Sequence, residues 1–232
     1  MNLTSRVLLL LGLGLLAGCS GARPRRYTDP KLLVTAACSP GATTKQVAGK
    51  VWIKAKSKDA SGQFPALVVA KEPDSLTLDV TNLLGASQAI IRVDGTKYII
   101  TRPKGQAESG SDSWGGIPLR WATSLFLGRV PCPPTGALAQ ARTSISDTDE
   151  LRIETTAALE REPEIFVFRF RELGGQPWPE ALHWERGGPV PVSVDFKFED
   201  PEDGTLSPRK WEAKSALGEV KALWKERSRN GA

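Results

Sequence analysis

In two stretches of the second half of the chain, a large apolar residue occupies every second position. Residues 166–171 place a phenylalanine at every second position, and residues 190–198 place a valine or a phenylalanine at every second position. Successive side chains of a β-strand point to opposite faces, so this spacing predicts strands with one buried face. Shorter alternating runs between Val51 and Thr101, separated by turn sequences such as Asp94-Gly95, carry the same signal. The sequence therefore predicts a mainly β protein, an antiparallel meander of eight or more strands.

Helical spacing is confined to three short segments. Asp29 to Ala37 predicts a short helix ahead of the sheet, and Pro118 to Leu127 predicts a short amphipathic helix. Near the C-terminus, Leu217, Val220, Leu223 and Trp224 fall at helical spacing among charged residues, and residues 214–232 are predicted to form an amphipathic helix. The predicted sheet domain accordingly spans residues 29–213.

The N-terminus has the layout of a secretory signal. Arg6 precedes a short apolar run over residues 7–16, which is too short to span a bilayer. The run ends in Leu16-Ala17-Gly18-Cys19, which resembles the lipobox of bacterial lipoproteins. The resemblance implies that residues 1–18 are removed and that Cys19 is acylated. The alternative is an ordinary signal followed by an incidental cysteine.

Residues 19–28 read as a flexible tether that follows the lipidated cysteine. Ser20 rather than aspartate follows Cys19, which resembles the sorting pattern of outer-membrane lipoproteins. The predicted location is therefore the outer membrane, with the domain lipid-anchored and facing the periplasm.

The net charge and the length of the chain exclude some functions and indicate a single domain. The formal net charge of the chain is +5 at pH 7 and is spread along the sequence, so binding to nucleic acid is not indicated. About 200 residues fit a single β domain of ordinary size. We expect a monomer with no apolar span beyond the signal.

Two cysteines remain once Cys19 is acylated. Cys38 and Cys132 form an even pair in an oxidising compartment, which favours a disulfide between them. Because the bridge would close a long loop, it would contribute about 4–5 kcal/mol in the chain-entropy model. The alternative is two separate buried thiols.

Residues 76–87, residues 116–131 and Pro191 to Phe198 share their order and spacing with the motifs of one known family. These three stretches resemble the LolB family, outer-membrane receptors for lipoproteins carried across the periplasm. Residues 76–87 resemble its strand–loop–strand, with Leu83 where proline is common. Residues 116–131 resemble its Gly-x-Pro segment, helix and Leu-Gly-x-Pro exit, and Pro191 to Phe198 stands where the family has its closing hairpin. The similarity covers roughly residues 45 to 200.

The resemblance implies an unclosed antiparallel β-barrel, a half-barrel covered by a few short helices, with an apolar cavity between sheet and helices. Such a cavity suits acyl chains. For any single residue, plain core packing is the alternative. The candidate cavity-lining residues are Leu76, Leu78, Val80, Ile91, Val93, Phe166, Phe168, Phe170, Val192, Val194 and Phe196.

A leucine at the tip of the loop in residues 76–87 is tied, in the resembling family, to inserting lipoproteins into the membrane. Leu83 and Leu84 are the corresponding membrane-insertion candidates here. The alternative is that one of these side chains tucks into the core.

The function implied by the resemblance is receipt of acylated lipoproteins from a LolA-like periplasmic carrier and their release into outer-membrane lipid. The alternative is a lipid-binding or envelope-scaffold lipoprotein with the same fold. No enzymatic activity, cofactor or metal is expected: the single histidine, His183, has no cysteine or second histidine at metal spacing, and no nucleophile elbow or phosphate loop is present.

Overall fold

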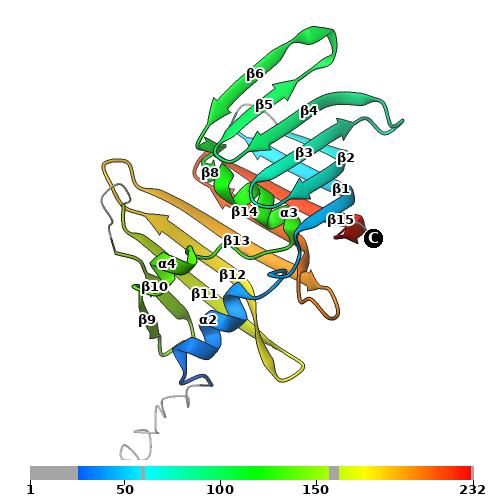
Figure 1. Ribbon diagram of the computed structural model, residues 1–232. Coiled ribbons are helices and arrows are strands. Elements are labelled where there is room, and N and C mark those ends of the chain that lie inside the picture. The colour runs from blue at the N-terminus through cyan, green and yellow to red at the C-terminus, as the bar shows by residue number, and fades with distance from the viewer. Residues whose placement is uncertain (1–25, 59–60, 157–161, 231–232) are drawn as a thin grey trace, which may run out of the picture.

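The computed structural model describes residues 26–58, 61–156 and 162–230 (Figure 1). Cys19, the signal and most of the tether lie outside the described residues. Antiparallel strands make up most of the described chain, as predicted. They are β1 (Gln46–Ser57), β2 (Ser61–Lys71), β3 (Ser75–Thr81), β4 (Ser87–Asp94), β5 (Lys97–Thr101), β6 (Ala107–Ser111), β9 (Arg142–Ile145), β10 (Leu151–Glu154), β11 (Glu164–Leu173), β12 (Gln176–Arg186), β13 (Val192–Pro201), β14 (Pro208–Ser215) and β15 (Gly218–Arg229).

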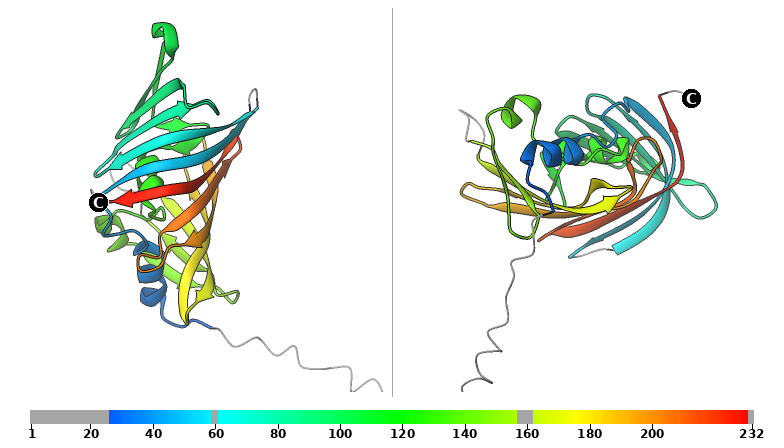
Figure 2. Two further views of the ribbon diagram at one scale, coloured as in Figure 1. Left: turned by 90° about the vertical axis from the view of Figure 1, so that its right-hand side faces the viewer. Right: turned by 90° about the horizontal axis from the view of Figure 1, so that it is seen from below.

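These strands form one 13-stranded sheet in the order β6-β5-β4-β3-β2-β1-β15-β14-β13-β12-β11-β10-β9. Consecutive strands of this sheet are neighbours in it, with the exception of β6 and β9, and β1 also pairs with β15. The edges are therefore β6 and β9, which come from the middle of the chain, and the sheet curls without closing (Figures 1 and 2). The predicted open, mainly β architecture is confirmed.

The segment between the two edge strands crosses the concave face of the sheet (Figure 2). A small hairpin of β7 (Ser113–Trp114) and β8 (Ile117–Pro118) is followed by η2 (Leu119–Trp121) and α3 (Ala122–Leu127), which matches the predicted short helix. The helix α3 ends at Gly128, whose φ of 80° is left-handed. The remaining short helices are η1 (Pro103–Gly105), α4 (Thr135–Leu138) and α2 (Pro30–Cys38), the last of these also as predicted.

The prediction of a C-terminal helix over residues 214–232 is wrong. Residues 218–229 form β15, a central strand paired with both β1 and β14. Ala222 and Trp224 are buried on its inner face, with Val220 partly buried beside them. A segment that completes hydrogen-bonded ladders on two sides overrides a weak helical spacing. The sheet domain therefore continues past residue 213.

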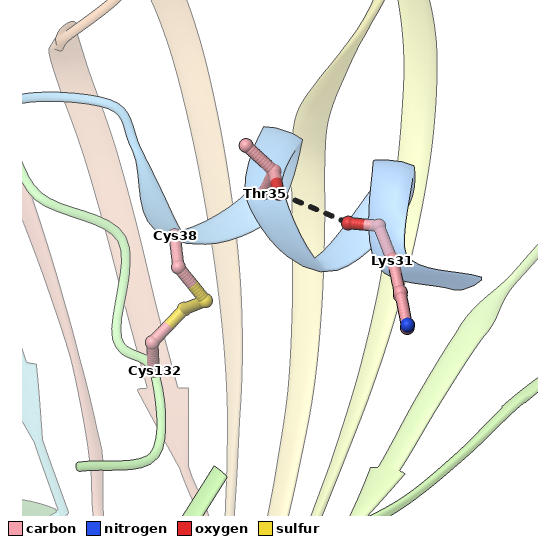
Figure 3. Close-up of a disulfide and its surroundings, with 4 residues drawn as sticks. All are labelled: Lys31, Thr35, Cys38 and Cys132. Atoms are coloured by element: carbon pink, nitrogen blue, oxygen red, sulfur yellow. Dashed lines mark hydrogen bonds between the residues drawn. A yellow bond between two sulfur atoms is a disulfide. The ribbon is translucent and has the colours of Figure 1, made fainter. Parts of the chain in front are cut away.

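A disulfide joins Cys38, the last residue of α2, to Cys132 (Figure 3). The helix begins at an N-cap, where Asp29 accepts a hydrogen bond from the Lys31 amide at 2.9 Å. The bridge spans 94 positions, for which the chain-entropy model gives about 4–5 kcal/mol. It ties α2, which packs on β12, to the segment that leaves α3.

The inner face of β10–β13, which we call the aromatic half, packs around Trp121 of η2. The ring centroid of Trp121 lies 4.5 Å from that of Trp184 and 5.6 Å from that of Phe196, both edge-on. Phe166 and Phe168 are fully buried in the same cluster. Edge-on aromatic pairs at these distances are favourable, so this half of the sheet is sealed.

Candidate functional site

An apolar groove lies between the inner face of β1–β5, which we call the groove half, and the cover made by β7, β8, η2 and α3. The neighbouring strands β14 and β15 contribute one residue each to its wall. Its inner part has a volume of about 70 Å³, and all of its lining residues are apolar. The sheet contributes Ile53, Ala55, Phe64, Leu76, Leu78, Ile91, Val93, Trp211 and Val220, and the cover contributes Trp114, Ile117, Pro118, Leu119, Ala122, Leu125 and Phe126.

The groove widens outward into a second part of about 470 Å³. The two parts share Phe64, Ile91 and Trp114 among their lining residues, so they form one continuous path. The outer part also meets polar and charged residues, among them Lys56 and Arg102. Its volume falls within the range of roughly 300–1,000 Å³ that is typical of ligand pockets. A largely apolar path with charged residues at its mouth, Lys56, Arg102 and Glu219, matches the two ends of an amphiphile.

The β7–β8 hairpin forms the cover over the mouth. Trp114 is 41 % exposed and stacks on Tyr98 of β5 at 6.2 Å between centroids. On the other side, the Ser215 hydroxyl donates a hydrogen bond to the Gly115 carbonyl at 2.6 Å. The hairpin is thus fastened to β5 and to the end of β14, which brings the two sides of the open sheet under one cover.

Five of the predicted cavity-lining residues do line the groove. Leu76, Leu78, Ile91 and Val93 face its inner part, and Val80 faces its outer part. They belong to β3 and β4, whose alternation places them on the inner face.

For the other six residues the prediction is wrong. Phe166, Phe168, Val194 and Phe196 are buried in the aromatic half, and Phe170 and Val192 are partly buried against the same core. None of the six lines either part of the groove. The physical reason is that this half of the sheet is covered: the Trp121 ring packs on Phe166 and Phe196, Tyr27 packs edge-on against Phe170, and α2 packs on β12 and β10. Sequence alternation marks an inner face but does not tell whether another side chain covers it.

Several lining residues were not predicted. Trp114 lay within a polar loop, and Val220 within the predicted C-terminal helix. Phe126 and Leu125 come from the short helix that was predicted, and their helical spacing could have identified them as its inner face.

Leu83 and Leu84 protrude from the β3–β4 turn, with 81 % and 93 % of their surfaces exposed. Asn82 shapes this turn, because its side-chain oxygen accepts hydrogen bonds from the Leu84 and Ala86 amides, each at 2.9 Å. Gly85 adopts a left-handed φ of 86°. The turn projects from the sheet (Figure 1), so neither leucine tucks into the core.

The buried charged groups lie away from the groove and serve the fold. Burial, together with nearby Arg209, lowers the pKa of Arg227 to about 10. Arg227 lies 3.5 Å from Glu202, which also pairs with Arg229. These contacts fasten the β13–β14 turn to β15.

His183 lies on the outer face of β12, away from the groove. It hydrogen-bonds to Asp195 at 2.7 Å and to Glu185 at 2.8 Å. Partial burial by itself lowers the pKa of His183, but these carboxylates outweigh it and raise the pKa above 6.5. Residues 26–58, 61–156 and 162–230 contain no cluster of three metal-ligating side chains. The absence of enzymatic activity stays a prediction.

No protein-family model matches the sequence, and no curated protein sequence matches it either. Among solved structures, a LolA superfamily protein from Nitrosomonas europaea superposes with a TM-score of 0.54 at 13 % identity, covering 87 % of this chain and 94 % of that one. The chain has a LolA-like fold. A DUF1329 family protein from Desulfovibrio piger gives the same TM-score at 8 % identity, covering 88 % of this chain and 94 % of that one.

In this LolA-like fold, the groove occupies the concave side of the open sheet. None of the helices in the described part of the chain is both long and apolar enough to cross a membrane.

Proposed function

We propose that the protein is an outer-membrane lipoprotein, anchored through acylated Cys19, that receives acylated lipoproteins from a LolA-like periplasmic carrier and delivers them to the membrane. The observation that carries the proposal is the groove, apolar at its inner end and polar at its mouth. An acyl chain would occupy the inner part, and the polar end of the cargo would stay at the mouth. The exposed Leu83 and Leu84 would then help the chain to enter the bilayer.

Transfer of this kind requires no covalent chemistry. Each buried methylene contributes about 0.8 kcal/mol. An acyl chain therefore moves to whichever protein or membrane buries a few more of its methylenes. The groove walls are mostly aliphatic side chains, from the sheet and from the cover, whose contacts with a chain are non-directional. Such walls hold chains of different lengths.

A second candidate is a lipid-binding or envelope-scaffold lipoprotein with the same fold. The narrow inner part, about 70 Å³, favours this candidate because it has little room for several acyl chains at once. This protein would bind a lipid with a single inserted chain and would not deliver lipoproteins.

The test uses a soluble form that begins at Ser20 and so retains every described strand and helix. It is mixed with a carrier loaded with an acylated lipoprotein. We expect the cargo to move to the wild type but not to Ile91→Trp, which fills the groove at a residue that is 5 % exposed. Ile99→Trp, at a half-exposed residue on the outer face of β5, is the matched control and should receive cargo normally.

Two further outcomes separate the candidates. Leu84→Glu should accept cargo but release little of it to liposomes, because a charged tip resists entry into the bilayer. A wild type that binds free lipid and takes no lipoprotein contradicts delivery and supports the second candidate. Absence of any acyl-chain binding contradicts both.

A further inference from the structure

The turns of the sheet are divided between its two ends. Because each strand runs antiparallel to the next, every second turn falls at the same end. One end carries the turns β1–β2, β3–β4, β5–β6, β12–β13 and β14–β15 and the mouth of the groove; we call it the groove end. The other carries β2–β3, β4–β5, β9–β10, β11–β12, β13–β14 and the start of α2; we call it the tether end (Figure 1).

Exposed large apolar residues in turns gather at the groove end. Besides Leu83 and Leu84, Val190 in the β12–β13 turn is 76 % exposed and Leu217 in the β14–β15 turn is 65 % exposed. Single exposed apolar residues need no explanation, but three turns at one end of a sheet form a group. Acidic residues occupy the corresponding turns at the tether end, including Asp74, Asp149, Glu202 and Asp203.

The groove end also carries lysines without acidic partners. Lys56, Lys58 and Lys104 are exposed, and none forms an ion pair with another residue of the described ranges. Nearby charges are paired: Arg102 lies 3.1 Å from Glu108, and Lys221 lies 2.9 Å from Glu219. Apolar tips and lysines that form no ion pair within the described ranges therefore coincide at the groove end.

We propose that the groove end docks on an anionic phospholipid bilayer, with Leu84 and Leu217 as two separate apolar tips and the three lysines against lipid phosphates. The proposal deepens the proposed function, on which it rests, by naming the surface that faces the receiving membrane. Leu84 and Leu217 come from turns whose centres are four strand spacings apart, about 19 Å across the sheet. Exposed leucines with flanking lysines are the chemistry of interfacial binding to anionic lipid.

Docking is distinct from anchoring. Arg26 lies at the tether end, where its amide donates a hydrogen bond to Asp149. Cys19 is seven residues away, a reach of at most about 25 Å. The tether is therefore long enough for the groove end to touch the bilayer while the tether end stays off its surface. An anchored molecule that does not dock would hold its groove end away from lipid.

The test uses the mature lipidated protein in vesicles of phosphatidylcholine and phosphatidylglycerol. A fluorophore is attached at Ala216→Cys, beside Leu217, or at Asp203→Cys, at the tether end, and a quencher is carried by the lipid. We expect strong quenching at position 216 and little at position 203. Equal quenching at both positions, or quenching at 203 alone, would overturn the proposal.

Two sets of variants, each made with the position-216 label, test the contacts. Leu217→Ser should lose most of the quenching, whereas Leu67→Ser, at a half-exposed leucine on the outer face of β2, should retain it. Replacing Lys56, Lys58 and Lys104 by glutamine should lower the ratio of docked to undocked protein on the order of a hundredfold. The same change at Lys45, Lys71 and Lys97, at the tether end, should leave the ratio unchanged. Quenching that is as strong on pure phosphatidylcholine would overturn the part played by the lysines.

The outcomes separate docking from cargo transfer. Ile91→Trp should fail to receive cargo and still be quenched at position 216. A wild type that is quenched but transfers no lipoprotein contradicts the proposed function and leaves docking intact. A wild type that transfers cargo without quenching contradicts docking alone.

Discussion

The two halves of one continuous sheet differ in how their inner faces are covered. In the aromatic half, Phe166, Trp184 and Phe196 pack edge-on against Trp121, and Phe168 stacks beside Phe166, all of them buried. In the groove half, the aliphatic side chains of β3 and β4 face the thin cover of β7, β8 and α3 across an apolar gap. The strands of both halves alternate in the same way. The difference teaches that the covering side chains, more than the strands, decide whether an inner face becomes a core or a groove.

Removing the disulfide should have the largest effect on stability, because the bridge ties the helix over the aromatic half to the segment that leaves the groove cover. We expect the double variant Cys38→Ser/Cys132→Ser to lose about 4–5 kcal/mol of unfolding free energy. Urea unfolding of the soluble form measures the change, with the single bridge of the oxidised wild type as reference. A loss below about 1 kcal/mol would show that α2 and the segment that follows α3 are held in place without the disulfide.

Truncation of one residue in each half tests the comparison directly. Trp184→Ala should cost about 3–5 kcal/mol, because it opens a cavity in a sealed cluster. Leu78→Ala should cost about 2 kcal/mol, at the low end for such a change, because its side chain already borders the groove. Both values come from the midpoint and slope of urea unfolding. Equal costs would mean that the groove half is packed as tightly as the aromatic half.

The smallest predicted effect concerns pH and arises on the aromatic half alone, since His183 is the single histidine of the chain. Its folded-state pKa is raised above 6.5, so protonated His183 stabilises the fold below about pH 6.5. This stabilisation is lost as the pH rises through the folded-state pKa. Because the side chain is 40 % exposed, we expect less than about 1 kcal/mol.

The measurement is the melting temperature between pH 5 and pH 8 for the wild type and for His183→Gln. The wild type should gain stability toward pH 5 relative to the variant. A difference between the two proteins that does not change with pH would contradict a role for the titration of His183.

The sheet and two of its short helices could be predicted from sequence because alternation and helical spacing are local signals. The run from Val192 to Phe198 folds as β13, and Asp29 caps the predicted helix α2. The segment after Lys214 could not be predicted from its spacing, because its structure depends on β1, more than 150 residues earlier in the chain. Its pairing with β1 is invisible in the local pattern.

The groove could be predicted only in part, for the same reason. Leu78 and Phe168 have equivalent places in alternating strands, yet one borders a groove and the other a sealed core. What separates them is the cover: Phe168 stacks beside Phe166, which lies under Trp121, whereas Leu78 borders the groove. The sequence places Trp121 in a short helix without indicating the strands it covers. The exposure of Leu84 likewise depends on the hydrogen bonds of Asn82, which fix the direction of the turn.

The pairing of β1 with β15 also determines the order in which the molecule is completed. The first strand is hydrogen-bonded to the last, so the centre of the sheet joins the two ends of the folded chain. Contacts between residues so distant in sequence raise the contact order and slow folding. A chain that emerges N-terminus first leaves β1 with one open side until its last strand has appeared. The complete sheet therefore forms only after β15 is available, and we expect truncation before Gly218 to leave the unpaired edges of β1 and β14 exposed to aggregation.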